Sequence, residues 1–142
     1  MKNVSNIFKK NFVLFLIGAA AYSLVEILWR GYTYFSMAVL GGTLFVFLGG
    51  INEYIPWDIS LILQGTVGAI SVTVAEFIAG VILNLWLGLG IWDYSNLPLN
   101  ILGQVCPQFS AAWFILSIVA IVFDDFLRYW LWDEKCPKYH LF

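Results

Sequence analysis

The fold is decided by one apolar stretch, residues 59–86, which reads ISLILQGTVGAISVTVAEFIAGVILNLW. A helix needs roughly 20 mainly apolar residues to cross a bilayer. This stretch is longer than that, and Glu76 is its only charged residue. Three further stretches are also mainly apolar: Asn11–Trp29, Ser36–Ile51 and Ser110–Trp132. We therefore predict an all-α membrane protein with four transmembrane helices, forming a single domain over residues 1–142.

The composition of the whole chain agrees with this prediction. Hydrophobic residues make up 61% of the 142 residues, charged residues make up 11%, and the mean hydropathy is +0.85. Soluble domains contain about 25% charged residues, and a domain of this size leaves about 30% of its surface exposed. A soluble monomer is therefore excluded, and the expected partner is the lipid bilayer. A net charge of −2 with seven Lys and Arg also excludes a nucleic-acid-binding protein, which must neutralise phosphates.

The segment between the last two spans, Trp92–Cys106, reads WDYSNLPLNILGQVC. It is apolar enough to enter the membrane, but it is too short and too rich in Pro, Asn and Gly to cross as a regular helix. Irregular backbone is tolerated in a membrane only where protein or water covers it. We predict a re-entrant or broken helix here, and a fifth, short and kinked span is the alternative.

The basic residues indicate the orientation. Lys2, Lys9 and Lys10 precede the first span, and Lys135 and Lys138 follow the last. Positive residues stay on the cytoplasmic side of a membrane, so both termini are expected in the cytoplasm, and an even number of spans follows. Aromatic residues gather at the expected interfaces as anchors: Trp29, Tyr32, Tyr34, Trp86, Trp92, Tyr94, Tyr129, Trp130 and Trp132.

Three of the spans carry small and polar residues along one narrow face. At 100° per residue, the polar positions of each of these spans fall on a single side of the helix. Small and hydroxyl-bearing residues let helices approach closely, so we expect a compact bundle whose acids point inward. The residues expected to line an intramembrane path for ions or a ligand are Glu26, Arg30, Thr73, Glu76, Asn84, Asp124 and Arg128.

An ionised carboxylate at the bilayer centre costs at least about 2.5–3.5 kcal/mol, so each acid needs a partner. Glu26 precedes Arg30 by four residues, and Asp124 precedes Arg128 by four, which is the favourable order for a helical ion pair. Glu76 has no basic neighbour on its own helix. It must be protonated, pair with Arg30 across the bundle, or face water. Pairs of this kind can also serve only to fix helix register, and both interpretations stay open at this point.

An internal two-fold repeat is a further hypothesis. A shift of 50 residues aligns Gly18–Ile27 with Gly68–Phe77, so that Glu26 falls on Glu76. A weaker match aligns residues 32–41 with residues 94–103. Repeats are common among transporters, but chance similarity in so apolar a sequence is the alternative.

The sequence offers no site for covalent chemistry. A phosphate-binding Gly-rich loop ending in Gly-Lys-Ser/Thr is absent from these residues. His140 is the only histidine, and the spacing of Cys106 and Cys136 is not typical of a metal or redox centre. We therefore expect no enzymatic activity, no cofactor and no metal site.

Residues 92–113 contain a motif that resembles the signature of a known family. The motif consists of Trp92, Asp93, Tyr94, Ser95, Pro98, Leu99, Asn100, Gly103, Gln104, Val105 and Cys106, followed by Ser110 and Trp113. It resembles a bacterial family of membrane proteins described as "putative ABC-transporter type IV", and Glu26 and Glu76 match the acid-bearing helices of that family. The resemblance implies a permease and identifies no transported substrate.

The re-entrant motif can be explained as a cap at the membrane surface. We expect Trp92 and Tyr94 to lie at the headgroups and Asp93 to cap the following turn. Pro98 frees backbone carbonyls. The amides of Asn100 and Gln104, four residues apart and close to Gly103, are expected to satisfy exposed backbone or to bind a ligand.

Two functions are consistent with these patterns. The first is a small permease- or channel-like protein whose inward-facing acids couple the movement of ions or protons. Because four short spans enclose little room, it is expected to work as a homo-oligomer or with a partner membrane subunit. The second function is a membrane scaffold, a sensor or a subunit of a larger complex that transports nothing itself.

Overall fold

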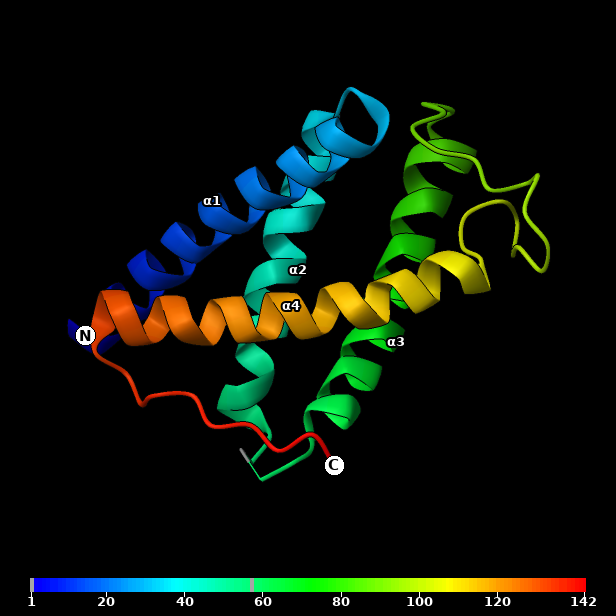
Figure 1. Ribbon diagram of the computed structural model, residues 1–142. Coiled ribbons are helices and arrows are strands. Elements are labelled where there is room, and N and C mark those ends of the chain that lie inside the picture. The colour runs from blue at the N-terminus through cyan, green and yellow to red at the C-terminus, as the bar shows by residue number, and fades with distance from the viewer. Residues whose placement is uncertain (1, 57) are drawn as a thin grey trace. The chain divides into compact units, whose positions relative to one another are not determined.

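The computed structural model describes residues 2–56 and 58–142. Within these ranges lie the helices α1 (Lys2–Arg30), α2 (Phe35–Tyr54), α3 (Leu61–Gly80) and α4 (Pro107–Trp132), and the π-helix η1 (Val81–Trp86) continues α3 (Figure 1). Four helical segments in this part of the chain are long and apolar enough to cross a membrane. The predicted all-α fold with four spans is confirmed, and the chain is a multi-pass membrane protein.

The first two helices extend beyond the apolar stretches that predicted them. α1 begins at Lys2 rather than at Asn11, and α2 runs to Tyr54 rather than to Ile51. Hydropathy identifies residues that tolerate lipid, whereas lysine and glutamate form helices well without tolerating it. Hydropathy therefore could not predict the polar start of α1 or the polar end of α2.

The other two helices begin where their local chemistry stabilises a first turn. α3 begins after Ser60, whose hydroxyl oxygen accepts a hydrogen bond from the Leu63 backbone N–H at 3.2 Å. α4 begins at Pro107 rather than at the predicted Ser110. Proline suits this position because the first turn of a helix leaves its N–H groups unpaired in any case.

The described residues form two compact units that share α4. Unit 1 contains α1, α2 and the second half of α4, and unit 2 contains α3, η1, residues 87–106 and the first half of α4. The boundary within α4 follows Val119. The single domain predicted for residues 1–142 stays a prediction.

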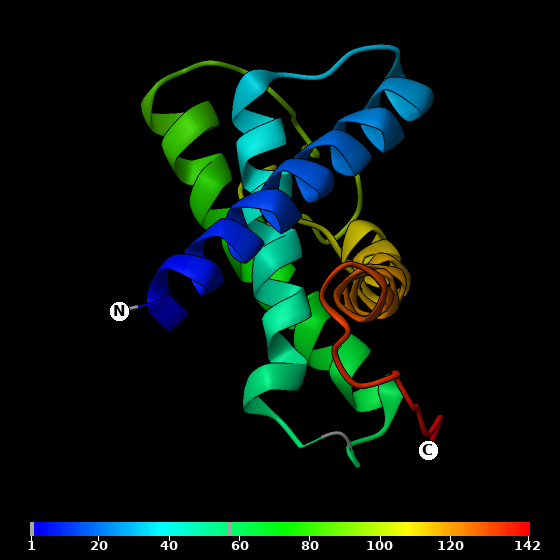
Figure 2. The same cartoon turned by 90° about the vertical axis from the view of Figure 1, so that its left-hand side faces the viewer.

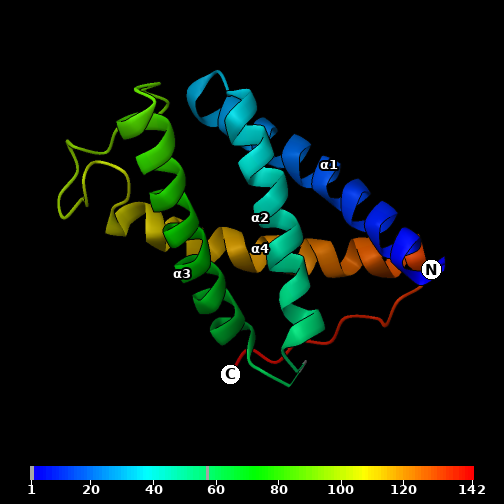
Figure 3. The same ribbon diagram turned by 180° about the vertical axis from the view of Figure 1, so that it is seen from behind.

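In unit 1, α1 and α2 form a helical hairpin joined by residues 31–34 (Figure 3). Glycines allow the two helices to approach closely. Gly18 of α1 lies against the Phe45 side chain, and Gly41 of α2 lies against Tyr22. The buried apolar side chains of this unit are Leu14, Met37, Phe45, Leu48, Ile51 and Ile121.

The second half of α4 crosses α2 in the same unit, as Figure 2 shows with α4 seen nearly along its axis. The rings of Phe45 and Phe123 lie 5.8 Å apart between the two helices. One turn further along α2, Gly49 lies against the Asp124 carboxylate. This crossing brings a polar cluster of α4 onto the last turns of α2.

In unit 2, residues 87–106 form no regular helix. Backbone hydrogen bonds organise these residues, among them those from the Ile101 N–H to the Val105 carbonyl at 2.9 Å and from the Tyr94 N–H to the Gly103 carbonyl at 2.7 Å. The predicted broken segment is therefore confirmed, and this segment contains no fifth helical span. That the segment dips into the membrane stays a prediction.

Part of the proposed repeat does not join equivalent elements. Residues 39–41 lie inside α2, whereas residues 101–103 lie in the non-helical segment of unit 2. The stronger match pairs Gly18–Ile27 with Gly68–Phe77, and both of these runs are helical. The weaker match is thus wrong as a structural repeat, because similar short apolar strings adopt different backbones when their surroundings differ.

Candidate functional site

Glu76 is the most unusual residue of unit 2 because a carboxylate that is only 3% exposed lies inside a membrane span. Its Oε1 atom accepts a hydrogen bond from the Tyr94 hydroxyl at 3.0 Å. Its Oε2 atom accepts one from the Trp113 indole N–H at 2.9 Å. The sequence predicted protonation, Arg30 or water for this acid, whereas the partners found are two neutral donors. The sequence did not predict that Tyr94 and Trp113 would donate hydrogen bonds to Glu76.

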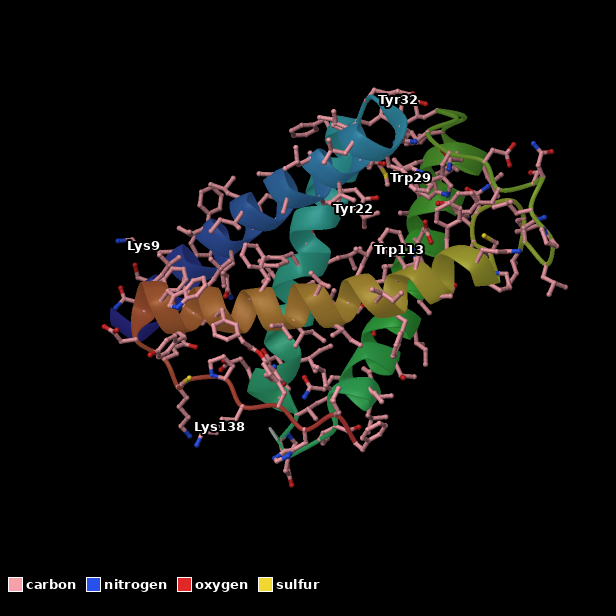
Figure 4. The ribbon with its side chains drawn as sticks, viewed as in Figure 1. Lys9, Tyr22, Trp29, Tyr32, Trp113 and Lys138 are labelled. Carbon is pink, nitrogen blue, oxygen red and sulfur yellow. The ribbon has the colours of Figure 1, made fainter. Side chains whose placement is uncertain are left out.

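Two different elements bring these donors to Glu76. Trp113 extends from the first half of α4, beside α3 (Figure 4). Tyr94 belongs to the non-helical segment, and its ring stacks on Phe109 of α4 with the ring centroids 4.5 Å apart. One turn before Glu76, the Thr73 and Ser110 hydroxyl oxygens lie 2.9 Å apart. A buried acid is thus held between α3, α4 and the segment that joins them.

Trp92 and Tyr94 make contacts inside unit 2 that the sequence did not predict, and their placement at the headgroups stays a prediction. Trp92 is 8% exposed, and its indole N–H donates to the Gln104 backbone carbonyl at 3.0 Å. The Tyr94 hydroxyl donates to Glu76. A buried indole or phenol needs a hydrogen-bond partner, and both find one inside unit 2. Their position between two spans suggested an interface, but it carried no information about these contacts.

The predicted amide residues satisfy polar groups of the chain itself. Asn84 of η1 donates to the Gln104 side-chain oxygen at 2.9 Å and accepts from the Ile91 backbone N–H at 2.7 Å. Asn100 accepts from the Gly103 backbone N–H at 2.9 Å. Of the two roles predicted for Asn100 and Gln104, these contacts correspond to the satisfaction of backbone, and Asn84 ties the segment to the end of α3.

The end of α3 is widened where these amides meet it. The Leu87 N–H bonds to the carbonyl of Ile82, five residues earlier, at 2.9 Å, which is the pattern of a π-helix. Gly80, at the start of the widened turn, lies against the Gln104 side chain. π-Turns occur frequently at functional sites, and this one lies one turn beyond Glu76.

Asp93 caps a turn, as the sequence predicted. Its Oδ1 atom accepts hydrogen bonds from the Ser95 hydroxyl and, at 2.8 Å, from the Ser95 backbone N–H. These hydrogen bonds, that of the hydroxyl first, lower the pKa of the Asp93 carboxyl below its ordinary value. Asp93 is exposed and lies in the sequence between two candidate spans, and its hydrogen bonds shape the start of the segment.

Gly103 packs on this turn, and a substitution there tests how far the turn stabilises the segment. Its φ is +71°, and an added Cβ would lie 2.5 Å from the Ser95 hydroxyl oxygen and 2.7 Å from Asp93 Oδ1. We expect Gly103→Ala to lose about 1–2 kcal/mol from the backbone alone, and more from displacing Ser95. Gly88→Ala is the control, because Gly88 has a φ of +65° and open space around it. Equal losses on thermal unfolding in detergent would show that the contact with the turn contributes nothing.

A second polar cluster lies in unit 1, where α4 crosses α2. The predicted ion pair is present, because Arg128 Nε donates to Asp124 Oδ2 at 2.5 Å. Asp124 is fully buried, and Arg128 is 6% exposed. The Arg128 guanidinium also lies 3.8 Å from Glu53 of α2. The neighbouring Asp125 carboxylate accepts a hydrogen bond from the Asn52 side-chain amide at 2.5 Å.

A third charged pair closes the end of α1. Arg30 Nη2 lies 2.7 Å from Glu26 Oε1, as the spacing predicted, and the Thr33 hydroxyl donates to Glu26 Oε2. The Arg30 guanidinium also lies 4.8 Å from the ring centroid of Tyr32 and 5.5 Å from that of Tyr34. This pair is partly exposed, and aromatic rings cover it.

Glu26 and Asp124 do not share one polar centre. Lys10, near the start of α1, interacts electrostatically with Asp124, whereas Glu26 is near the end of the same helix. The 16 positions from Lys10 to Glu26 correspond to about 24 Å of helix. The sequence predicted only that both acids lie on inward faces, because helical periodicity predicts the face on which a residue lies and not its height along the helix.

Two residues that contact the buried acids were not predicted from the sequence. Trp113 was recognised only as part of the motif, although it donates to Glu76. Asn52 was placed beyond the end of the second span, yet it is 5% exposed in the last turn of α2. A usable signal for Asn52 was its position three residues after Gly49, on the same helical face.

One comparison with known proteins identifies a family. The sequence model of a family described as "Putative ABC-transporter type IV" matches residues 6–134, which is most of the chain and reaches all four spans. No curated protein and no solved structure matches the chain. The resemblance expected from residues 92–113 is thereby confirmed.

Proposed function

This chain belongs to the family described as "Putative ABC-transporter type IV", and from that premise we propose that it is a permease-like membrane subunit in which Glu76 binds a proton or a small cation during transport. The observation that carries the proposal is the position of Glu76. It is a buried acid inside a span, and both of its hydrogen-bonding partners found in unit 2 are neutral.

Neutral donors hold a carboxylate in place without compensating its charge. Tyr94 and Trp113 each occupy one oxygen of Glu76, and each oxygen retains a further lone pair. A buried acid near the bilayer centre is expensive and usually marks an ion or proton pathway. Glu76 therefore remains able to take up a proton or a cation. Tyr94 and Trp113 fix the orientation of its carboxylate.

The same contacts connect Glu76 to the non-helical segment. Tyr94 lies on that segment, and Trp113 lies on α4. A proton on Oε1 of Glu76 would give this oxygen an O–H that can donate, so its hydrogen bond with the Tyr94 hydroxyl would be able to reverse. In the proposed mechanism, occupation of Glu76 thus changes how the segment after η1 is held against α3.

The energy for active transport would come from outside these residues. The 142 residues contain no Gly-rich loop ending in Gly-Lys-Ser/Thr, so we place ATP hydrolysis on a partner ATPase. Because four spans enclose little room, we also propose that the chain works as a homo-oligomer or with a partner membrane subunit.

The proposed location is a bacterial cytoplasmic membrane with both termini in the cytoplasm. Lys9 and Lys138 lie toward one end of unit 1, and Trp29 and Tyr32 lie at the other end (Figure 4). Basic residues remain on the cytoplasmic side, and aromatic residues favour the interfaces. The end of α2, where Asn52 and Glu53 contact Asp125 and Arg128 of α4, would then also be cytoplasmic.

Glu76→Gln tests the role of the acid. The substitution keeps the size of the side chain but removes its charge, and a hydrogen bond to a charged group contributes about 1.5–3 kcal/mol. In proteoliposomes with an imposed proton or ion gradient, we expect the flux carried by the wild-type chain to fall at least about tenfold, the factor that corresponds to about 1.4 kcal/mol. A pH-sensitive dye inside the vesicles measures proton flux, and an ion-selective electrode measures the other ions.

Glu53→Gln is the matched control, because it removes the same charge from a side chain that is 52% exposed. It should leave the flux close to that of the wild type. Unchanged flux in Glu76→Gln would remove Glu76 from the mechanism. The absence of any flux with the wild-type chain would count against the permease class as a whole.

The second candidate function, a scaffold, sensor or subunit without transport, is favoured by the cluster in unit 1. Arg128 contacts both Asp124 of α4 and Glu53 of α2, so it can fix the register of two helices. A scaffold requires such rigidity and needs no occupied acid in unit 2. The flux measurement on Glu76→Gln therefore separates the two candidates.

A further inference from the structure

We propose that the cluster at the crossing of α2 and α4 binds one monovalent alkali cation, between the Asp124 carboxylate and the Asn52 side-chain oxygen. This inference concerns unit 1 and does not depend on the function proposed for Glu76.

Two oxygen atoms of this cluster are buried without a hydrogen-bond partner among the described residues. They are Oδ1 of Asp124 and Oδ1 of Asn52, in residues that are 0% and 5% exposed. The other polar atoms of these side chains are occupied, since Asp124 Oδ2 accepts from Arg128 and Asn52 Nδ2 donates to Asp125. Leaving a buried acceptor unsatisfied is unfavourable. Both atoms are acceptors, so what satisfies them must be a cation or a hydrogen-bond donor.

The two oxygens belong to the same contact between helices. The Asp124 carboxylate lies directly against Gly49 of α2. Asn52 follows Gly49 by three residues, so both lie on the face of α2 that meets α4. The absence of a side chain at Gly49 is what allows a carboxylate of α4 to approach α2 this closely.

The charges of the cluster favour a single positive charge. Its buried side chains are Asp124, Asp125, Arg128 and Asn52, which supply two acids and one base. Their sum is one negative charge, and a monovalent cation neutralises it. The cluster also lies at the last turn of α2, which ends at Tyr54, and the C-terminal end of a helix stabilises cations.

Of the described charged groups outside the cluster, Lys10 and Glu53 act electrostatically on Asp124. The Lys10 ammonium also forms an ion pair with Glu134, which offsets part of its effect. Glu53 lies 3.8 Å from Arg128 but is 52% exposed, and water screens its charge. A further negative charge at that distance would in any case favour a cation.

The donor atoms indicate an alkali cation rather than a transition metal. Carboxylate and amide oxygens are hard ligands, which suit hard cations. Among the described residues, no group of three or more His, Cys, Asp or Glu side chains is arranged to hold a metal ion. Two acids opposed by one arginine therefore suit Na⁺ or K⁺ better than a divalent ion.

Direct binding of Na⁺ to the purified chain in detergent tests the proposal. In equilibrium dialysis with radioactive Na⁺ at constant ionic strength maintained with choline chloride, we expect saturable binding of one ion per chain. NaCl should also raise the thermal unfolding temperature, followed by tryptophan fluorescence, relative to choline chloride. Asn52→Leu removes one ligand oxygen and should raise the dissociation constant at least about tenfold, the lower end of the effect of disturbing a metal site.

Glu53→Gln is the control for binding by general negative charge, because it removes an acid beside the cluster and leaves both buried oxygens in place. It should bind Na⁺ nearly as well as the wild type. Equal weakening in the two variants would overturn the proposal, and so would the absence of saturable binding to the wild type. A stabilisation that depends on pH and not on Na⁺ would assign the missing charge to a protonated aspartate and would also overturn it. If Asn52→Leu does not fold, dialysis of Glu76→Gln decides the question, because this variant removes the other acid proposed to bind a cation. Saturable Na⁺ binding should persist in it, and loss of that binding would overturn the proposal.

Discussion

Arg128→Ala is expected to lower the free energy of unfolding by about 3–5 kcal/mol, the usual effect of removing one partner from a buried ion pair. The Arg128 guanidinium donates to Asp124 at 2.5 Å, and the Asp124 side chain is fully buried. Without the arginine, the buried Asp124 carboxyl group keeps no hydrogen-bond donor among the described residues, which leaves it unsatisfied or forces it to take up a proton. Denaturation in detergent micelles, followed by the helical circular dichroism signal, measures the loss.

Arg30→Ala is the matched control for this prediction. Arg30 and Glu26 have the same spacing of four residues, but the Arg30 side chain is 21% exposed, compared with 7% for Arg128. The Glu26 side chain is 12% exposed, whereas that of Asp124 is fully buried, so the acid left unpaired is less completely desolvated and we expect a smaller loss than in Arg128→Ala. Losses of similar size in the two variants would contradict the argument from burial.

A double variant separates the charge of the pair from its packing. Asp124→Leu combined with Arg128→Met removes both charges and keeps most of the side-chain volume. Apolar replacement of a whole buried pair is often neutral or stabilising, so we expect the double variant to regain most of the stability that Arg128→Ala loses. A double variant as unstable as the single one would mean that Arg128 acts through its other contact, with Glu53.

The spans and the two helical ion pairs could be predicted because they depend on information close together in the sequence. Hydropathy over about 20 residues predicts a span. A spacing of four residues predicts that Glu26 meets Arg30 and that Asp124 meets Arg128. Neither inference requires knowledge of how one helix packs on another, and the structure contains all of these features.

The partners of Glu76 could not be predicted in the same way. Tyr94 is 18 residues away from Glu76, and Trp113 is 37 residues away. The non-helical segment, residues 87–106, has no regular periodicity. Leu99 and Leu102 in this segment even adopt left-handed backbone, with φ of 58° and 53°. Without a repeating geometry, the sequence provides no rule for where the Tyr94 hydroxyl points.

The cluster in unit 1 was missed for a different reason. Polar residues marked one face on each of three spans. The face of α2 that contacts α4 instead contains glycines, which produce no polar pattern in the sequence. Gly49 admits Asp124, and Asn52 then meets Asp125. Which glycine receives a carboxylate depends on where α4 crosses α2, and this crossing is a property of tertiary packing.

Gly49→Ala is expected to be the most disruptive single-methyl addition in α2. An added Cβ at this position would overlap the Asp124 carboxylate. Overpacking alone costs about 1–3 kcal/mol, and moving the carboxylate also weakens its bond with Arg128. The neighbouring Gly50 offers the matched control, because its added Cβ would lie 3.6 Å from the Tyr54 ring, an ordinary contact. Gly50→Ala should stabilise the protein by about 0.5–1 kcal/mol, since glycine disfavours the interior of a helix.

A double-mutant cycle shows whether the cost of Gly49→Ala arises from the ion pair. If the new methyl group acts by displacing Asp124 from Arg128, its cost should shrink in an Arg128→Ala background, where that bond is already lost. Residues that share a contact commonly show coupling energies of about 0.5–3 kcal/mol, so we expect a coupling in this range from unfolding in detergent. Strictly additive losses would mean that α2 and α4 separate to admit the methyl group. In that case the close contact at Gly49, and not the bond between Asp124 and Arg128, would be what holds the two helices together.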